Sequence, residues 1–357
     1  MPSGARTPER RGGACRRPLG AEIRAGTSPA ATERVRHLPR RWLGAAVLAW
    51  AALGLLGCAG GSAAAPSAAK QAAPASASGQ VAGASAATAA DRVLYIGGIP
   101  DQSTATLTRA FEGFARYLSG RTGLIVKYAP AADYAAIVTA FKRGDVHLVW
   151  FGGLTGVQAQ AAVPGSEALA QRPRDAEFHS KFIVQAGLPA QKLTDLKGLT
   201  FTFGSESSTS GHLMPRYFLR QAGIDPDKDF KGKPNFSGSH DKTWKLVETG
   251  AFQAGALNEA VWESALKDNK VDLTKVREFY ITPAYYDYHW AVRGDVDQVF
   301  GAATKEKLRQ ALLGMRPEHG PEAQEALKLF ATDRFIETKN ENYDGIRQVA
   351  LQLGILR

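Results

Sequence analysis

The sequence turns from strand to helix at H-L-V-W-F-G-G-L-T, residues 147–155. Residues 147–151 form a short apolar run that is typical of a buried strand, the glycine pair marks a turn, and a helical pattern begins at Thr155. In open parallel sheets, ligands bind beyond the carboxyl ends of strands, where helix N-termini point. The stretch therefore predicts an α/β fold and marks one edge of a binding site.

Two further strand–helix pairs precede this stretch. Strands are predicted at 92–99 and 124–128, because both runs are short, apolar and rich in β-branched residues. A helix with Ser103 as cap and Gly120 as stop follows the first, and a helix capped by Asp133 follows the second. This β-α-β-α-β-α order predicts a parallel sheet with right-handed crossovers.

A second α/β set begins near Phe182, and the sequence from Tyr288 onward is mostly helical. Together they predict two lobes, residues 91–181 with 288–357 and residues 182–287, each a doubly wound α/β unit with the ligand cleft between them. The second set has predicted strands at 182–185, 200–203, 235–236, 254–257 and 277–281, helices at 211–222 and 242–249, and a returning strand at 288–292.

Composition excludes several classes of protein. The chain has 357 residues, 44% of them hydrophobic and 22% charged, so a disordered chain, a collagen and a disulfide-stapled miniprotein are excluded. The net charge of +10 suggests nucleic-acid binding, but residues 1–57 hold ten arginines and three acids. The other 300 residues carry a net charge of only +3. The basic balance therefore belongs mostly to the N-terminal segment, and no nucleic-acid surface is predicted.

Residues 1–57 are interpreted as a leader and lipoprotein signal peptide. An uncharged run of 15 residues, 42–56, follows a basic stretch and is too short to span a bilayer comfortably. It ends in L-L-G-C at Cys58, which resembles a bacterial lipobox, so we expect this cysteine to be lipidated. The alternative is an uncleaved membrane anchor with an incidental cysteine. Either location is the cell envelope, on the extracytoplasmic face.

Two further expectations concern this N-terminal region. Arg-rich sequence upstream of a signal peptide is unusual, and bacterial translation can start at a valine codon, so we expect the true start near Val35. Residues 58–90 are mostly Ala, Ser, Gly and Pro, and their single charged residue is Lys70. Such a composition cannot bury a core and predicts a flexible tether between the lipid and the folded lobes.

The predicted strand end before the helix at 211–222 carries S-E-S-S-T-S-G, residues 205–211. Ser208, Thr209 and Ser210 offer three hydroxyl donors, and the helix that follows offers free N–H groups and the positive end of its dipole. The alternative is that these residues only cap the helix. One cap needs one such residue, and six of the seven residues here are Ser, Thr or Gly. The segment therefore favours an anion-binding loop.

For several other candidate residues, an ordinary structural role is the alternative to ligand binding. Trp150 and Phe151 close a strand and are typical of a core, and Tyr134 is typical of a surface helix start. A lone histidine such as His240 is most often a helix cap or a core residue. The segment Y-Y-D-Y-H-W at 285–290 holds four aromatics in six residues, which suits a wall around a small ligand.

Taken together in this order, the motifs resemble the phosphonate/phosphite/phosphate family of bacterial ABC-transporter substrate-binding proteins, and within it the subgroup assigned to selenate transport. The similarity covers about Val93 to Leu356. It implies an α/β fold like that of the type II periplasmic binding proteins, with two doubly wound lobes and a ligand cleft between them. The segments that carry it are I-P-D-Q at 99–102, D-Y-A-A at 133–136, L-V-W-F-G-G-L-T-G-V-Q-A at 148–159, F-T-F-G-S-E-S-S-T-S-G at 201–211, F-S-G-S-H-D-K-T at 236–243, G-A-L-N-E-A-V-W at 255–262, Y-Y-D-Y-H-W at 285–290 and N-E-N-Y at 340–343.

The resemblance implies roles for individual residues. Many phosphonate binders carry a proline and an aromatic where this chain has Gly153 and Gly156, and this departure argues against a bulky organic substituent on the ligand. The ligand-binding positions of the family map onto Ser208, Thr209 and Ser210 for the anion, Tyr134 with Trp150 or Phe151 for the aromatic lining, His240, Asp287 and, less directly, Glu259.

The leading hypothesis is a lipid-anchored, monomeric binding protein that delivers a small oxyanion to an ABC permease and its ATPase subunits, without cofactor or metal. The rival is an extracytoplasmic hydrolase that uses a serine with His240 and Asp241. No G-x-S-x-G elbow supports it, and adjacent His and Asp side chains diverge, so no enzyme is predicted. A third hypothesis is a ligand-sensing protein that works with a separate receptor.

The motifs leave the identity of the oxyanion open between small phosphorus oxyanions and selenate. Selenate is fully deprotonated near neutral pH, so a carboxylate facing it would be repelled. Phosphate, phosphite and phosphonates retain a proton that can be donated to Asp or Glu. If Asp287 touches the ligand, a proton-bearing oxyanion is favoured, and if Asp287 orients His240 or a tyrosine instead, selenate remains an alternative.

Overall fold

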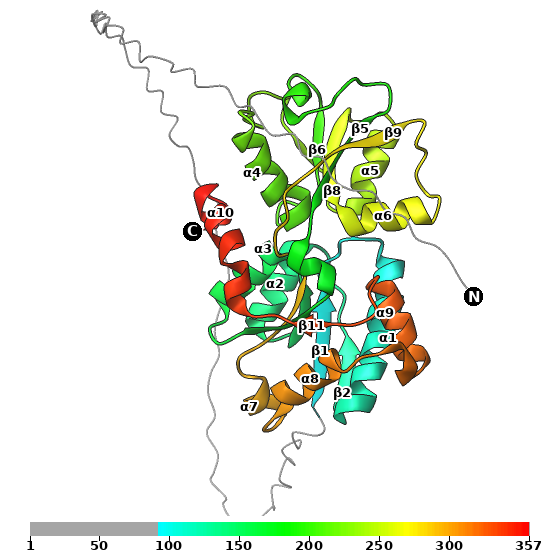
Figure 1. The fold of residues 1–357 in the computed structure, drawn as a ribbon. Coiled ribbons are helices and arrows are strands. Elements are labelled where there is room, and N and C mark those ends of the chain that lie inside the picture. The colour runs from blue at the N-terminus through cyan, green and yellow to red at the C-terminus, as the bar shows by residue number, and fades with distance from the viewer. Residues whose placement is uncertain (1–91, 357) are drawn as a thin grey trace, which may run out of the picture. The chain divides into compact units, whose positions relative to one another are not determined.

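The computed structural model describes residues 92–356, and their strands form two separate sheets (Figure 1). The first sheet has the order β11-β4-β10-β3-β1-β2. Its strands are β1 (Val93–Gly98), β2 (Ile125–Tyr128), β3 (Leu148–Phe151), β4 (Glu167–Gln171), β10 (His289–Val292) and β11 (Ile336–Glu337).

The second sheet is built from one continuous part of the chain and has the order β7-β6-β8-β5-β9. The fold is thus the mixed α/β architecture that the sequence predicts. The strands of this sheet are β5 (Ser180–Gln185), β6 (Phe201–Phe203), β7 (Asn235–Phe236), β8 (Ala254–Asn258) and β9 (Val276–Ile281).

Helices pack against both sheets. In the first lobe α1 packs against β2, α8 and α9, and α3 packs against α2, β10 and α10, while in the second lobe α5 lies against β8 and α6. The α-helices are α1 (Thr104–Thr122), α2 (Tyr134–Arg143), α3 (Gly153–Ala162), α4 (Met214–Gln221), α5 (His240–Glu248), α6 (Glu259–Lys267), α7 (Val296–Phe300), α8 (Thr304–Leu313), α9 (Pro321–Leu329) and α10 (Asp344–Gln352). The short turns are η2 (Pro173–Glu177), η3 (Leu193–Leu196), the π-helical η4 (Thr209–Leu213), η5 (Pro317–His319) and η6 (Asn340–Tyr343).

The first sheet is mixed, although the sequence order predicts a parallel one. β1 pairs in parallel with β2 and β3, as expected from the crossover helices. β10 then inserts antiparallel between β3 and β4, and β11 is antiparallel to β4. The reason is that the chain returns from the second sheet before forming β10, so no crossover helix sets that strand's direction.

Helix ends follow the sequence signals closely, with one exception. Ser103 and Asp133 cap α1 and α2 through their side chains, and Gly144 ends α2 in the left-handed region with φ of 83°. The prediction that α1 stops at Gly120 is wrong. The helix continues to the next glycine, Gly123, whose φ of 74° makes it the left-handed cap.

Sequence patterns missed two strands. β4 has the sequence E-A-L-A-Q, which lacks the β-branched and aromatic residues that indicate a strand, and β11 has only two residues. Both lie at one side of the first sheet, where pairing with β10 and with each other fixes them. Tertiary pairing therefore overrides weak local propensity here.

Among residues 92–356 no helix combines the length and the apolar character needed to cross a membrane. The expectations for Val35, Cys58 and the tether at 58–90 lie outside the described residues.

Gly156 accommodates the buried ring of His289. A Cβ atom at position 156 would lie 2.3 Å from His289 Cε1, which no side chain tolerates without movement. The small residue in α3 therefore serves the packing of β10 against the helix.

We predict that Gly156→Ala lowers the free energy of unfolding by about 1–3 kcal/mol, because the added methyl overpacks the His289 site. Gly120→Ala is the matched control, since nothing lies within 4 Å of an added Cβ in that helix. That control should be neutral or stabilising by up to about 1 kcal/mol. Urea unfolding followed by circular dichroism measures both. Equal midpoints for Gly156→Ala and the wild type would contradict the packing role.

Candidate functional site

The N-terminus of α3 is held by side chains from two distant parts of the chain. The N–H of Leu154 donates to Thr209 Oγ1 at 2.9 Å, and the N–H of Gly153 donates to Asp287 Oδ1 at 2.9 Å. The first N–H groups of a helix have no intrahelical partner, so these acceptors satisfy them. The end of β3, the serine–threonine loop (residues 205–211) and the segment around Asp287 that returns to the first sheet therefore meet at the start of α3.

The serine–threonine loop is buried and preorganised. Ser208 caps η4, with its Oγ accepting from the N–H of Gly211 at 2.9 Å, and Ser208, Thr209 and Ser210 are each at most 2% exposed. A Cβ at Gly211 would lie 2.9 Å from both Ser208 Oγ and His240 Cε1, so the loop needs glycine there. The structure thus brings the three predicted hydroxyl residues together at a helix start.

Asp287 has one oxygen engaged and one free. Oδ1 accepts from Gly153, whereas Oδ2 is buried and has no hydrogen-bond partner among the described residues. Burial raises the pKa of Asp287 to about 7, while the Gly153 N–H and the Thr209 and Ser210 hydroxyls lower it. The group is therefore close to half protonated near neutral pH, and its free oxygen is available for a ligand.

Tyr134, at the start of α2, also carries a buried hydroxyl without a partner in the described part of the chain. Burial raises its pKa well above the usual value, the charges of Asp101 and Asp287 raise it further, and the Ser208 hydroxyl lowers it. The phenol therefore stays protonated and is a hydrogen-bond donor. Its neighbours place it beside the serine–threonine loop.

A polar network links the two sheets next to this point. Tyr288 Oη donates to Asp101 Oδ2 at 2.9 Å and accepts from Asn258 Nδ2 at 2.8 Å, and the N–H of His240 donates to the carbonyl of Asp101 at 3.1 Å. Asp101 follows β1 of the first sheet, whereas Asn258 and His240 belong to the second lobe. The network joins the lobes across the cleft.

His240 is a neutral member of this network. Its Nδ1 accepts from the N–H of Asn258 at 3.4 Å, and its Nε2 lies 3.5 Å from Tyr288 Oη. Burial lowers the pKa of His240 to about 3, and burial raises that of Asp101 to about 6. His240 is therefore uncharged at neutral pH and offers no positive charge to an anion.

The remaining predicted site residues are Phe151, Trp150 and Glu259. Phe151 is fully buried in the core, with its ring edge-on to Phe141 at 5.4 Å. Trp150 stacks on Tyr288 at 5.6 Å. Neighbouring residues of a strand face opposite sides of a sheet, so only one of this pair faces the Tyr288 network, and it is Trp150.

Glu259 begins α6, and its pKa is raised by burial and lowered by the nearby charges of His179 and Arg174. It influences the pKa of Tyr285, whose hydroxyl lies 2.7 Å from Ser180 Oγ. Glu259 is therefore close to the wall formed by Tyr285, with no direct bond to the serine–threonine loop.

Sequence reasoning did not place Asp101, Asn258 or Tyr288 among the site residues. Signals existed, since Asp101 lies in the I-P-D-Q segment and Tyr288 in the aromatic run at 285–290. Their pairing depends on how the two lobes meet, and local sequence patterns carry no information on that contact.

The geometry gives no support to a hydrolase. Asp241 accepts from Ser239 Oγ at 2.6 Å and does not orient His240, whose partners are Asn258 and Tyr288. Within residues 92–356, no group of His, Cys, Asp or Glu side chains is arranged to hold a metal ion.

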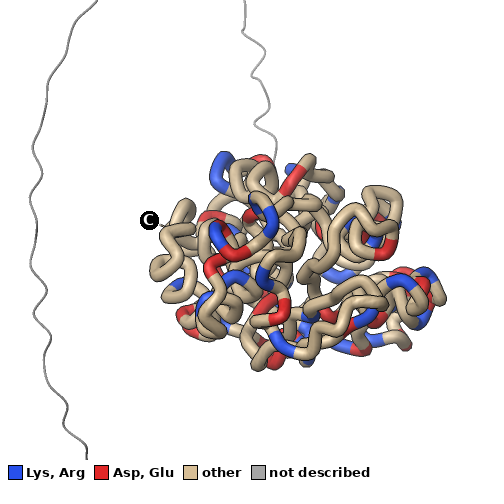
Figure 2. The backbone as a smooth tube through the Cα atoms, turned by 90° about the horizontal axis from the view of Figure 1, so that it is seen from above, with Lys and Arg blue, Asp and Glu red and all other residues tan. Residues whose placement is uncertain are grey.

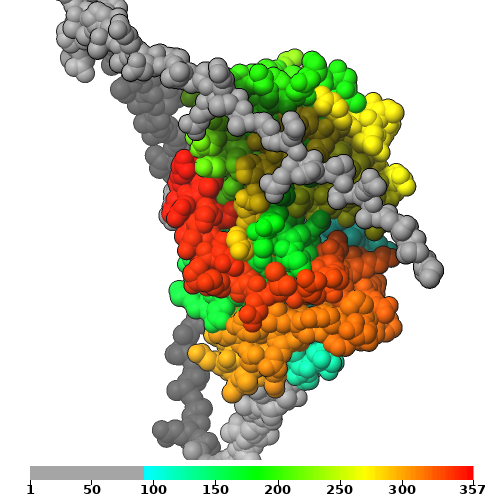
Figure 3. Space-filling view, in the orientation of Figure 1, coloured from blue at the N-terminus to red at the C-terminus, as the bar shows by residue number. Residues whose placement is uncertain are grey.

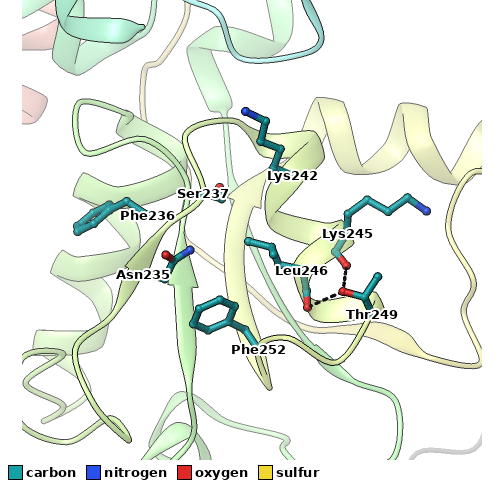
Figure 4. Close-up of a pocket in the computed structure, with 8 residues that line it drawn as sticks. All are labelled: Asn235, Phe236, Ser237, Lys242, Lys245, Leu246, Thr249 and Phe252. Atoms are coloured by element: carbon teal, nitrogen blue, oxygen red, sulfur yellow. Dashed lines mark hydrogen bonds between the residues drawn. The ribbon is translucent and has the colours of Figure 1, made fainter.

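A surface pocket of about 510 Å³ lies elsewhere, between β7, α5 and Phe252 (Figure 4). In Figure 4 the Thr249 hydroxyl bonds back to the carbonyls of Lys245 and Leu246, so it serves the end of α5. None of the predicted site residues lines this pocket. It holds no orphaned buried polar atom either, so it is not the candidate site.

Comparisons with known proteins identify the family to which the chain belongs. Residues 96–343, well over half of the chain, match the family model described as ABC transporter, phosphonate, periplasmic substrate-binding protein. The chain is 44% identical over 273 residues to the probable ABC transporter phosphite binding protein PhnD1 of Prochlorococcus marinus (strain MIT 9301), covering 74% of this chain and 91% of that protein. It is 24% identical over 259 residues to the phosphate-import protein PhnD of Mycolicibacterium smegmatis, covering 70% and 74%.

Among solved structures, PhnD1 of Prochlorococcus marinus in complex with methylphosphonate matches with a TM-score of 0.72 and 44% identity, covering 74% of this chain and 99% of that one. The relatives are substrate-binding components of importers, so the prediction of a binding protein with no enzymatic activity is confirmed. The two-lobed α/β fold is confirmed as well. The chain belongs to the family of periplasmic substrate-binding proteins of phosphonate ABC transporters.

Proposed function

We propose that this protein binds a small phosphorus oxyanion that carries a proton, phosphite or methylphosphonate, and delivers it to an ABC permease. The observation that carries the proposal is the pair of buried, unpartnered polar atoms beside the serine–threonine loop, Tyr134 Oη and Asp287 Oδ2. Leaving a buried polar group unsatisfied costs about 1–3 kcal/mol, so two together indicate that a ligand completes the site.

The donors suit an oxyanion. Ser208, Thr209 and Ser210 bring hydroxyl groups to the start of a helix, and Tyr134 adds a phenol that stays protonated. Donors held in place by the backbone need no reorganisation when the ligand arrives, and the positive end of the helix dipole favours negative charge. This arrangement binds three or more oxygens of a tetrahedral anion.

Asp287 selects among tetrahedral anions. Oδ2 faces the site as an acceptor when ionised, and it would repel an anion whose oxygens are all acceptors. Phosphite and methylphosphonate can retain one exchangeable proton near neutral pH, and a single proton shared between ligand and carboxyl removes the repulsion. Sulfate and selenate lack that proton, so the site favours the phosphorus oxyanions over the selenate that the subgroup resemblance suggests.

The relatives support the same ligand class. PhnD1, 44% identical to this chain, is described as a phosphite binding protein and has been solved with methylphosphonate. Its ligand is small, in line with the sequence-based argument against a bulky substituent.

We assign residues 91–181 with 288–357 to one lobe and residues 182–287 to the other, with the ligand enclosed between them. The division into two sheets supports these limits, because β5 to β9 form the second sheet and all other strands form the first. Contacts such as Thr209 to Leu154 and His240 to Asp101 are then made between lobes. Hinge closure around a ligand is the usual motion of such proteins.

The proposal also covers the location and the partners of the protein. A periplasmic substrate-binding protein works outside the cytoplasm with permease and ATPase subunits. We propose that lipid on Cys58 anchors it to the membrane and that it acts as a monomer.

We predict that the affinity for phosphite depends on pH. Burial raises the pKa of Asp287 to about 7, so above about pH 8 both the carboxyl and the ligand have lost the shared proton. Binding must then take up one proton, and the affinity for phosphite falls by up to about tenfold per pH unit. Asp287→Asn removes the titrating carboxyl, so its affinity should change little over the same range. Calorimetry in two buffers of different ionisation enthalpy measures affinity and proton uptake, and a pH slope that persists in the variant would contradict the assignment.

The second prediction concerns the hydroxyl donors. Ser210→Ala should weaken binding of methylphosphonate by about 10- to 150-fold, because a donor to a buried charge is worth about 1.5–3 kcal/mol. Ser207→Ala, in the same loop and outside the buried trio, is the control and should bind like the wild type. Wild-type affinity in a Thr209→Ala, Ser210→Ala double variant would refute the anion-loop assignment. Failure of phosphite, methylphosphonate and selenate to bind at millimolar concentration would refute the oxyanion proposal itself.

The third prediction concerns the anchor. Cys58→Ser removes the thiol that the lipid would occupy, so the protein should move from the membrane fraction to the soluble extracytoplasmic fraction. Oxyanion affinity of the soluble form should match that of the wild type. Equal membrane retention of the two proteins would show that Cys58 is not the site of anchoring.

A further inference from the structure

A wide groove opens on the side of the cleft formed by α1, α5, α6 and α9. One part of it has a volume of about 910 Å³ and a second part about 400 Å³, and the two share residues Gln102, Thr106, Asp241, Trp244 and Lys270. The first lobe contributes α1 and α9 to this groove, and the second lobe contributes α5 and α6. The groove therefore runs along the line where the two lobes meet.

The groove carries an excess of positive charge. Six basic side chains line it, against the acids Asp241, Asp268 and Glu325. Over residues 92–356 the sequence holds 32 basic and 30 acidic side chains, so the groove accounts for more than the whole net charge of the described part. Figure 2 shows basic and acidic residues interspersed along the rest of the backbone. The basic residues of the groove are Arg109, Lys242, Lys245, Lys267, Lys270 and Lys328.

Several of these charges are not used in ion pairs. Lys245 and Lys270 pair with Glu248 and Asp268. In the described part of the chain, Lys242, Lys267 and Lys328 form no salt bridge, and all three are exposed. Their positive potential is therefore available to an approaching anion.

The groove leads toward the candidate site. It shares Gln102, Val261 and Lys328 with a small inner cavity of about 60 Å³, whose wall includes Asp101 and Tyr288 of the network that joins the lobes. That volume holds only a few water molecules, so a ligand passes when the lobes separate.

The opposite side of the cleft is covered. There α10 packs against α3 and η4, the two elements whose starts form the site. Figure 1 shows α10 on the left and α6 and α9 on the right, and in Figure 3 the red C-terminal residues cover the left side. The basic groove is therefore the side from which a ligand reaches the loop.

We infer that the basic groove is the entrance of the binding site and that Lys242, Lys267 and Lys328 steer the anionic ligand into it. The inference rests on the proposed function. Clefts with low-dielectric walls focus the field of the charges that line them, and steering of this kind raises association rates by about 10- to 1000-fold at low ionic strength. Because these lysines are exposed and lie outside the serine–threonine loop, we expect them to raise the association rate constant with little effect on the dissociation rate constant.

The test compares two triple variants with the same change in net charge. The groove variant is Lys242→Gln, Lys267→Gln, Lys328→Gln. The control is Lys127→Gln, Lys192→Gln, Lys233→Gln, whose lysines are exposed and line none of the groove's cavities. Stopped-flow tryptophan fluorescence with methylphosphonate gives both rate constants, with Trp150 as the expected reporter because it stacks on Tyr288.

At about 20 mM salt, the groove variant should associate about five- to twentyfold more slowly than the wild type, and the difference should shrink below about twofold at 0.5 M salt. The control should stay within about twofold of the wild type throughout. Equal association rates for the two variants, or a change confined to dissociation, would overturn the inference. If the groove variant does not fold, a wild-type association rate that is independent of salt would overturn it equally. Absence of binding by the wild type would instead refute the proposed function.

Discussion

The arrangement of the site depends on the free N–H groups at the start of α3. They lie directly after β3, and the acceptors that satisfy them are Thr209 from the second lobe and Asp287 from the segment that returns to the first. This contact determines which oxygen of Asp287 is occupied and which is free. It also holds the serine–threonine loop against the start of α3, so the proposed anion site requires that the two lobes are together.

Burial shifts the ionisable side chains of the candidate site toward their uncharged forms. Asp287 and Asp101 have raised pKa values, and His240 has a lowered one, in each case mainly because water is excluded. Nearly neutral groups of this kind avoid the cost of burying further fixed charges, while the buried cation in the wall of the inner cavity, Arg172, is paired with Asp175. Under the proposed function, selectivity comes from the direction of hydrogen bonds, with hydroxyls donating and one carboxyl accepting. The inferred steering places charge attraction at the surface.

Much of this could be predicted from sequence, and the rest has physical reasons for being hidden. The hydroxyl trio at Ser208 to Ser210 is local, so spacing and composition were sufficient to identify it. Asp287 came from the family resemblance, because a lone acid in an aromatic segment has no pattern of its own. The bond between Tyr288 and Asp101 depends on contact between lobes, and β4 depends on its neighbours in the sheet. Long-range pairing of this kind leaves no periodic trace in the sequence.

The insertion of β10 between β3 and β4 has a consequence for how the chain folds. The first sheet is completed only when β10 and β11 are added, and these strands are synthesised after the whole second sheet. Closing the loop from β3 to β10 is costly in entropy unless the intervening chain has already become compact. The second sheet is continuous in sequence and can form first, which shortens that loop. On a ribosome the inserted lobe would thus fold before the lobe that contains it is complete, because β10 in the interior of the first sheet and β11 at its edge emerge last.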